Sequence, residues 1–420
     1  DSLLDHPPGD SETTIPSLSS KVPSRENGLI KVLEDGTTKI HFPIREGVKF
    51  HNGATLTPED IEYTYERAIL IGGINEIYSL MTSSLIGSSD FNTLVEEVGY
   101  DAAYDKLDAA IEVEDGVLVF TLPEPFVPFL GLVADSGAGT GALNKEWCLE
   151  QGCWPGTKET GQDYMNQTGE ESPLFDKMMG TGPFKLASWE PNQRMVFERF
   201  EDYWNGPAKL ARVVRRIVTD NQTAIMLLKQ GDIDFLQIVD PANLSQVEGV
   251  EGITMVKNLP SVVLRKVNFN FKFKEGSKYI GNGKLGENGI PPEFFSDIHV
   301  RKAFNYAFNF DTFINEVMLG YSKKPYGPVH IGFPTADPNT PQYTYDPEKA
   351  EEHFKKAWGG ELWEKGFKFT GVYPAGSTHR QRAIQILQAE VSKINPKFHI
   401  ELASLPWASY VSGVYQEIVP

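Results

Sequence analysis

The stretch that decides the fold is residues 366–403, which opens with Gly366-Phe-Lys-Phe-Thr-Gly-Val-Tyr373. Its apolar residues alternate with polar ones, which predicts a strand. Phe398-His-Ile-Glu-Leu-Ala403 closes the stretch with the same alternation and predicts a second strand. Residues 380–394 predict a helix between them, whose inward face carries Ala383, Ile384, Leu387, Val391 and Ile394. A strand, a helix and a strand in this order indicate an α/β domain.

A second unit of this kind is predicted earlier in the chain. Residues 213–218 predict a strand, and residues 222–230 predict a helix that Gly231 ends. Asp232-Ile-Asp-Phe-Leu236 predicts the next strand. Two such units favour two α/β domains. Further strands are predicted over residues 38–42, 117–122, 181–186, 194–199 and 262–271.

Capping residues mark several helix starts. In Thr57-Pro58-Glu59-Asp60, Thr57 is the predicted N-cap, Pro58 takes the first helical position, and the acids lie in the first turn. Asp297, Asp311 and Asp346 predict three further helices in the same way. The apolar face of the first helix is predicted to be Ile61, Tyr65, Ala68 and Ile69.

Size and charge limit the function. At about 150 residues a domain, the 420 residues predict two or three domains. The chain has 39 basic against 57 acidic residues, a net charge of −18, which disfavours nucleic-acid binding. Its apolar stretches are too short for a membrane-spanning helix. The sequence shows no signal peptide and begins without an initiator Met, so we expect further sequence at both ends.

Cys148 and Cys153 are the two cysteines. Gly152 and Pro155 mark a turn that favours a disulfide between them, formed in an oxidising compartment. Loop entropy gives such a bond about 2 kcal/mol of stability. The alternative is a pair of free thiols. A metal site is disfavoured because no histidine lies near them in the sequence.

Motifs of catalysis are missing from the sequence. It has no HExxH, no G-x-S-x-G elbow and no Walker loop. Gly137-Ala-Gly-Thr-Gly141 could cradle a phosphate, but a flexible turn is the better interpretation. Asp232 and Asp234 share one face of a predicted strand, where surface polarity is a simpler explanation than acid–base catalysis.

Aromatic residues follow the two strands that decide the fold. Tyr373-Pro-Ala-Gly-Ser-Thr-His379 links a strand to a helix, and Trp407 comes just after the second strand. Open α/β sheets bind ligands at the carboxyl ends of their strands, so Tyr373 and Trp407 are candidate ligand contacts. The alternative for each is packing within its own domain.

Five motifs follow one another along the chain. They are Ile44-Arg-Glu-Gly-Val-Lys-Phe-His-Asn-Gly53 with Leu56-Thr-Pro-Glu-Asp60; Gly180-Thr-Gly-Pro-Phe184 with Phe200-Glu-Asp-Tyr-Trp204; Leu228-Lys-Gln-Gly-Asp-Ile-Asp234; Val300-Arg-Lys-Ala-Phe-Asn-Tyr-Ala307 with Asp311; and Tyr345-Asp-Pro-Glu-Lys-Ala350. Their order and spacing resemble the family 5 extracellular solute-binding proteins of ABC importers, the dipeptide- and oligopeptide-binding group.

The resemblance implies an α/β fold of the two-lobed, periplasmic-binding-protein-like type II class, with an accessory domain. Residues 1–178 would form the accessory domain and parts of lobe 1, residues 179–267 lobe 1, and residues 268–420 lobe 2. A return of the chain to lobe 1 would lie beyond residue 420. Lys266-Val-Asn-Phe-Asn270 would be a strand crossing between the lobes. The ligand-binding residues would be Asn268, Asn270, Tyr373 and Trp407.

The function that the resemblance implies is transport without chemistry. The protein would be a receptor that captures a small solute by hinge closure and delivers it to ABC permease subunits. Relatives bind peptides, sugars, nickel complexes or haem; a peptide is the first expectation and an oligosaccharide the second. The expected protein is a monomer, periplasmic or extracellular, with or without a lipid anchor, and without enzyme activity, cofactor, metal or nucleic acid. A hydrolase of peptides or glycans and an adhesive surface protein are the alternatives.

Overall fold

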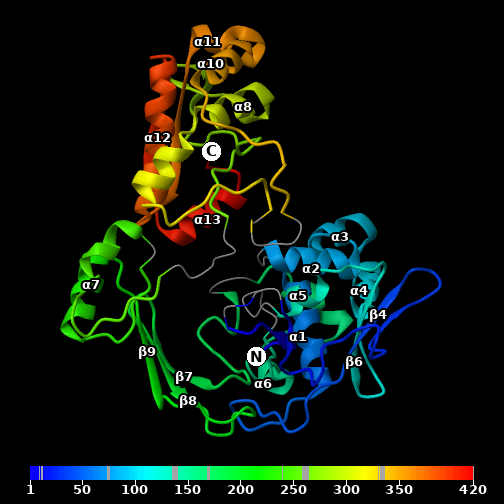
Figure 1. Ribbon diagram of the computed structural model, residues 1–420. Coiled ribbons are helices and arrows are strands. Elements are labelled where there is room, and N and C mark those ends of the chain that lie inside the picture. Colours follow the sequence, from blue (N-terminus) through cyan, green and yellow to red (C-terminus); the bar gives the residue numbers. More distant parts are fainter. Residues whose placement is uncertain are drawn as a thin grey trace. The chain divides into compact units, whose positions relative to one another are not determined.

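The computed structural model (Figure 1) divides the chain into two compact units, Asp1–Ile217 and Val218–Pro420. The structure describes residues 1–8, 10, 13–72, 76–134, 141–167, 171–238, 240–257, 264–329, 331 and 336–419. The proposed glycine loop at 137–141 lies almost entirely outside these residues. The finer boundaries after residues 178 and 267 stay predictions.

The first unit is built on a four-stranded antiparallel sheet. Its strand order is β3 (Ile30–Val32), β4 (Thr38–Phe42), β6 (Val117–Leu122) and β5 (Ile111–Glu114). Thr38, Ile40 and Phe42 are buried, as the alternation in β4 requires. The strands predicted at 38–42 and 117–122 are confirmed.

Helices cover this sheet, and α1 (Pro58–Ile71) packs against β5 and β6. The Asp60 carboxylate accepts hydrogen bonds from the backbone N–H and the hydroxyl of Thr57, at 3.0 and 3.1 Å, and fixes the start of α1. The predicted apolar face of α1 is buried throughout. The remaining helices of the unit are α2 (Glu76–Ile86), α3 (Phe91–Val98), α4 (Tyr100–Asp108), α5 (Phe129–Ala134), α6 (Lys145–Glu150) and a 3-10 helix (Lys158–Tyr164).

A separate antiparallel sheet is formed by the last strands of the first unit. It contains β7 (Phe184–Glu190), β8 (Arg194–Arg199) and β9 (Arg212–Arg216), in that order. These are the strands predicted over residues 181–186, 194–199 and 213–218; the second has the predicted bounds, and the ends of the other two are shifted. A short pair, β1 (Leu4–Asp5) and β2 (Ile15–Pro16), lies near the N-terminus.

The second unit contains the strand–helix–strand element that the sequence predicts. β11 (Phe367–Pro374) and β12 (Phe398–Leu405) are parallel, and α12 (Thr378–Ile394) connects them. α12 packs on both strands, and a Cβ at Gly371 would lie 2.7 Å from Ile384 Cγ2. Glycine in β11 therefore lets the helix approach the sheet closely. α13 (Trp407–Tyr415) follows β12 (Figure 1).

Phenylalanine rings form the core of this second unit. Phe367 of β11 and Phe398 of β12 stack with centroids 4.6 Å apart. The other rings of the cluster are those of Phe294, Phe295, Phe304, Phe354 and Phe369, all buried. The elements around it are α8 (Ile298–Ala307), α10 (Pro347–Lys356), α11 (Glu361–Lys365), β10 (Gly281–Gly286) and the 3-10 helices Phe294–Ser296 and Ala357–Gly360.

The predicted caps of this unit are right in two cases out of three. Asp297 accepts from the His299 N–H at the start of α8, and Asp346 accepts from the Lys349 N–H at the start of α10. Asp311 is not a cap. The helix begins earlier, at α9 (Phe310–Thr312), because the Asn309 side chain accepts from the Thr312 N–H. A π-helical turn, Phe313–Val317, continues it.

The earlier strand–helix–strand prediction fails at its second strand. α7 (Asn221–Gln230) forms and ends at Gly231, whose φ is 77°. Residues 232–236 then form no strand, and neither do residues 264–271. The reason is the lack of a neighbour: within the described part of the chain, no strand pairs with either segment, and Phe235 is 83% exposed. Residues 262 and 263 lie outside the described ranges.

Candidate functional site

A small pocket in the second unit is the best-formed candidate site. Its volume is about 190 Å³. Polar and apolar side chains are mixed in its wall, as in sites that bind small molecules. The lining residues are Asn221, Ala224, Ile225, Leu236, Gln237, Ile238, Asp240, Asn243, Gly376, Ser377 and His379.

Two helix starts hold one wall of this pocket in place. Asp220 caps α7 by accepting from the Thr223 N–H at 2.8 Å, and Asn221 follows it into the lining. Asp240 caps the 3-10 helix Pro241–Gln246 by accepting from the Ala242 N–H. Gln222 donates from Nε2 to Asn243 Oδ1 at 3.3 Å and joins the two elements.

The opposite wall is the connection from β11 to α12, residues 375–377, together with the first turn of α12. His379 lies there with 6% of its surface exposed. Arg265 donates from Nη1 to His379 Nε2 at 2.7 Å. Because a guanidinium has no acceptor, Nε2 carries the lone pair and the imidazole proton belongs on Nδ1. Burial, followed by the charges of Arg265 and Arg380, lowers the pKa of His379 to about 4.

Two cations, Arg265 and Arg380, lie near His379. Burial, then the charge of Arg380, lowers the pKa of Arg265. Among the described residues, neither arginine forms an ion pair with a carboxylate. Arg380 instead lies with its guanidinium carbon 5.6 Å from the centre of the Trp407 ring. Such an arrangement attracts an anionic group of a ligand.

The predicted ligand contacts lie in different surroundings. Trp407 is 61% exposed and stacks on Tyr410, so it is no core residue of this unit. Tyr373 is half-buried in β11, opposite Ser404. Asn268 is exposed, and Asn270 donates from Nδ2 to the Val419 carbonyl at 2.9 Å. None of the four is in the pocket lining, and their role stays a prediction.

Arg265 and His379 were missed by sequence reasoning. The sequence indicates the segment 373–379, which includes His379, but with Tyr373 as the candidate ligand contact. Arg265 stands 114 residues from its partner in the sequence and carries no local motif, so nothing short-range could have identified it.

The chemistry of the pocket suits binding better than catalysis. Ser377 Oγ lies 3.5 Å from His379 Nε2, which suggests a nucleophile and its base. However, Arg265 occupies the Nε2 lone pair, and the lowered pKa of His379 makes it a weak base. In the described ranges, no three metal-ligating side chains come together. Asp232 and Asp234, the other suggested pair, are both exposed.

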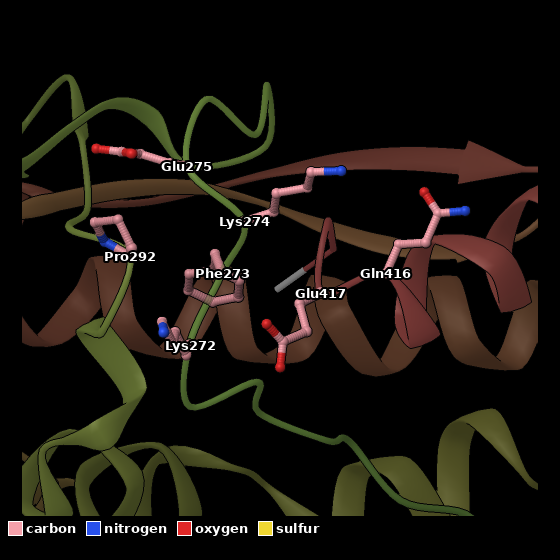
Figure 2. Close-up of a pocket in the computed structure, with 7 residues that line it drawn as sticks. All are labelled: Lys272, Phe273, Lys274, Glu275, Pro292, Gln416 and Glu417. Atoms are coloured by element: carbon pink, nitrogen blue, oxygen red, sulfur yellow. The ribbon is translucent and has the colours of Figure 1, made fainter. Parts of the chain in front are cut away.

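A second pocket in the same unit is larger but less selective. Its volume is about 510 Å³, and Figure 2 shows its lining side chains. They are Lys272, Phe273, Lys274, Glu275, Pro292, Gln416 and Glu417. The backbone N–H of Lys274 donates to the Glu417 carbonyl at 2.8 Å and joins its two sides. Because charges of both signs surround it, this pocket favours no one class of ligand.

The cysteine pair lies in the first unit. Cys148 and Cys153 are buried and free, so the predicted disulfide is not formed in this structure. Their side chains are nevertheless hydrogen-bonded to each other. The disulfide stays a prediction.

Known proteins resemble this chain over most of its length. The chain is 23% identical over 394 residues to a dipeptide-binding protein of Escherichia coli. This alignment covers 91% of the chain and 63% of the relative. It is 23% identical to a glutathione-binding protein of Pectobacterium atrosepticum, over 87% of the chain and 57% of the relative. The chain thus spans about three fifths of the length of these relatives.

Solved structures show the same fold. The periplasmic binding protein DppA of Helicobacter pylori, in complex with the peptide STSA, matches with a TM-score of 0.67 and 22% identity, over 98% of this chain and 69% of that one. The likeness confirms the predicted class, an α/β fold of the type II periplasmic-binding-protein kind. The family model of the bacterial extracellular solute-binding proteins, family 5, matches residues 25–418. The chain therefore belongs to the family 5 bacterial extracellular solute-binding proteins.

Proposed function

We propose that the protein is the solute-binding receptor of an ABC importer. It captures a small solute outside the cytoplasm and delivers it to the permease subunits without altering it. Family membership supports this role. The observation that carries it is the pocket at the carboxyl end of β11, where Arg265 donates a hydrogen bond to His379 and Arg380 lies near.

A peptide or peptide-like solute is the first proposed ligand. The two named relatives bind a dipeptide and glutathione, and the solved neighbour holds a peptide. At about 190 Å³ the pocket is smaller than a whole-ligand site, so it would take one end or one side chain. An anionic end suits Arg265 and Arg380, and the amides of Asn221, Gln237 and Asn243 suit peptide groups.

An oligosaccharide is the second proposed ligand. One observation favours it: Trp407 is 61% exposed and stacked on Tyr410, which presents a flat apolar surface of the kind on which a sugar ring packs. Tyr373, Asn268 and Asn270 would add polar contacts in either case.

The proposed mechanism is a population shift. A ligand that contacts both lobes stabilises the closed state over the open one. In this proposal lobe 1 comprises residues 179–267 and lobe 2 residues 268–420. Residues 1–178 form the accessory domain and parts of lobe 1. The protein would act as a monomer, without cofactor or enzyme activity, in the periplasm or outside the cell, with or without a lipid anchor. The helices of the described residues include none long and apolar enough to cross a membrane.

Native mass spectrometry of the full-length protein tests the proposal first, since a receptor can retain its ligand through purification. Calorimetry with defined di- to pentapeptides and with oligosaccharides follows, on wild type and on Arg265→Met. We expect one class to bind and Arg265→Met to weaken it about tenfold, the loss of one charged hydrogen bond. Arg25→Met, an exposed arginine of the first unit, is the control. Ligand that leaves with an altered mass would establish the hydrolase instead, and no binding by either class would exclude both proposed ligands.

A further inference from the structure

The end of α6 brings two cysteines together through its backbone geometry. Cys153 donates its N–H to the Cys148 carbonyl, and Gly152 donates to the Leu149 carbonyl, both at 3.0 Å. Gly152 has a φ of 85°. This is the Schellman arrangement of a helix end, in which the residue after the glycine packs on the side chain five positions earlier. Here the two packed side chains are both thiols.

A cation faces this pair from a different helix. Arg67 of α1 carries a positive charge that stabilises a thiolate at Cys153. Its Nε is buried and has no hydrogen-bond partner in the described part of the chain. A guanidinium with a buried Nε that lacks a partner is stabilised by a negative group, and a thiolate at Cys153 would supply one.

We propose that Cys148 and Cys153 form a redox-active pair that oxidises to a disulfide across the end of α6, and that Arg67 positions and activates Cys153 as the attacking thiolate. The hydrogen bond from Cys148, and then the charges of Arg67 and Lys177, lower the pKa of Cys153 against its burial. The hydrogen bond to Cys153, burial and the Asp60 carboxylate raise the pKa of Cys148, with Arg67 opposing. The charge of Arg67 therefore favours the thiolate form of either cysteine, and Cys153 also feels the charge of Lys177.

The reaction balances with a disulfide donor such as oxidised glutathione. The Cys153 thiolate attacks one donor sulfur and releases one donor thiolate. Cys148 then loses its proton to water and attacks the sulfur of Cys153 in the mixed disulfide, which releases the second donor thiolate. The protein loses two electrons and two protons, and the donor is reduced to two thiols.

The test follows disulfide formation in the full chain. The wild-type protein is incubated with oxidised glutathione from pH 6 to pH 9, and the reaction is quenched with acid. The protein is then unfolded and alkylated, and its intact mass is measured by mass spectrometry. We expect a species that is lighter by two hydrogen atoms and takes up no alkylating agent. Wild type that keeps two alkylatable thiols after long incubation overturns the disulfide.

Variants of Arg67 test its role separately. Arg67→Met should slow the reaction about tenfold at pH 7 and move its pH profile upward, because the thiolate fraction of Cys153 falls. Arg67→Lys should restore most of the rate. Lys177→Met, an exposed position, should give a smaller shift in the same direction and serves if Arg67→Met fails to fold. An unchanged pH profile in a folded variant overturns the assignment to Arg67.

Discussion

Arg265 Nη1 lies 2.7 Å from His379 Nε2, and burial, together with the charges of Arg265 and Arg380, lowers the pKa of this imidazole. A polar side chain that is buried and charge-neutral can orient a ligand without competing for its charge. The same pair sets the pH behaviour of the second unit.

The stability of the second unit should fall as the pH falls from 6.5 towards 4. The pKa of His379 is lowered to about 4 in the folded state, so only the unfolded chain binds the proton in this window. The expected loss is about 2 kcal/mol by pH 4.5. Hydrogen exchange on peptides covering 375–394 measures it. His379→Gln should remove this slope, whereas the exposed His399→Gln should keep it; equal slopes in both variants would refute the assignment.

The first unit should respond to pH in the opposite direction, through Glu66 of α1. Burial, then the charges of Glu62 and Asp108, raises the pKa of Glu66 to about 8. The unfolded chain releases this proton near pH 4.5 and the folded unit keeps it, so stability falls as the pH rises from 4.5 to 8. Glu66→Gln should stabilise this unit by roughly 2 kcal/mol at pH 7.5 and change little at pH 4.5.

Denaturation of the Glu66→Gln variant at both pH values checks this prediction. Hydrogen exchange in α1 measures the stability. Glu59→Gln alters an exposed glutamate of the same helix and is the matched control. A stabilisation that is equal at both pH values would mean that ionisation of Glu66 is not the cause.

Trp407 should matter for binding and not for folding. Because its side chain is 61% exposed, Trp407→Ala should leave the melting temperature nearly unchanged and weaken the ligand about tenfold. Calorimetry and differential scanning measure the two effects. Trp154, which is fully buried in the first unit, is the contrast: Trp154→Ala should cost about 3 to 5 kcal/mol. Affinity retained alongside a large stability loss in Trp407→Ala would make Trp407 a structural residue.

Asp60 should be a strong determinant of the first unit. One of its oxygens accepts from Thr57, and the other accepts from the Lys145 backbone N–H at 2.8 Å, so a single carboxylate joins the starts of α1 and α6. Asp60→Ala should cost about 3 kcal/mol, because it removes the charged hydrogen bonds that join the starts of the two helices. Chemical denaturation against Glu59→Ala checks it; similar midpoints for the two variants would contradict the prediction.

Local signals in the sequence predicted the elements well. The alternation in Phe367–Pro374 and Phe398–Leu405 and the caps at Thr57, Asp297 and Asp346 act within a few residues, and the structure has each of them. Segments that depend on distant neighbours were predicted less well. Residues 232–236 have the composition of a strand, but no described strand lies beside them to form a ladder.

The candidate site was predicted only in part for the same reason. The position of a ligand loop follows from chain order, so the loop before α12 was found. Its central interaction joins Arg265 to His379 across 114 residues, which no short pattern reveals. The prediction of Asp311 as a cap is wrong because Asn309, two residues earlier, offers the same capping chemistry and takes the position.

The connection between β11 and α12 separates two demands on one segment of chain. The rings of Phe367, Phe369 and Phe398 belong to the core, while Gly376, Ser377 and His379 line the pocket. Substitutions in the connection at residues 375–377 can therefore change the pocket without changing the packing of the rings. Exchanging residues 375–377 between homologues would therefore change this wall of the pocket and leave the phenylalanine core as it is.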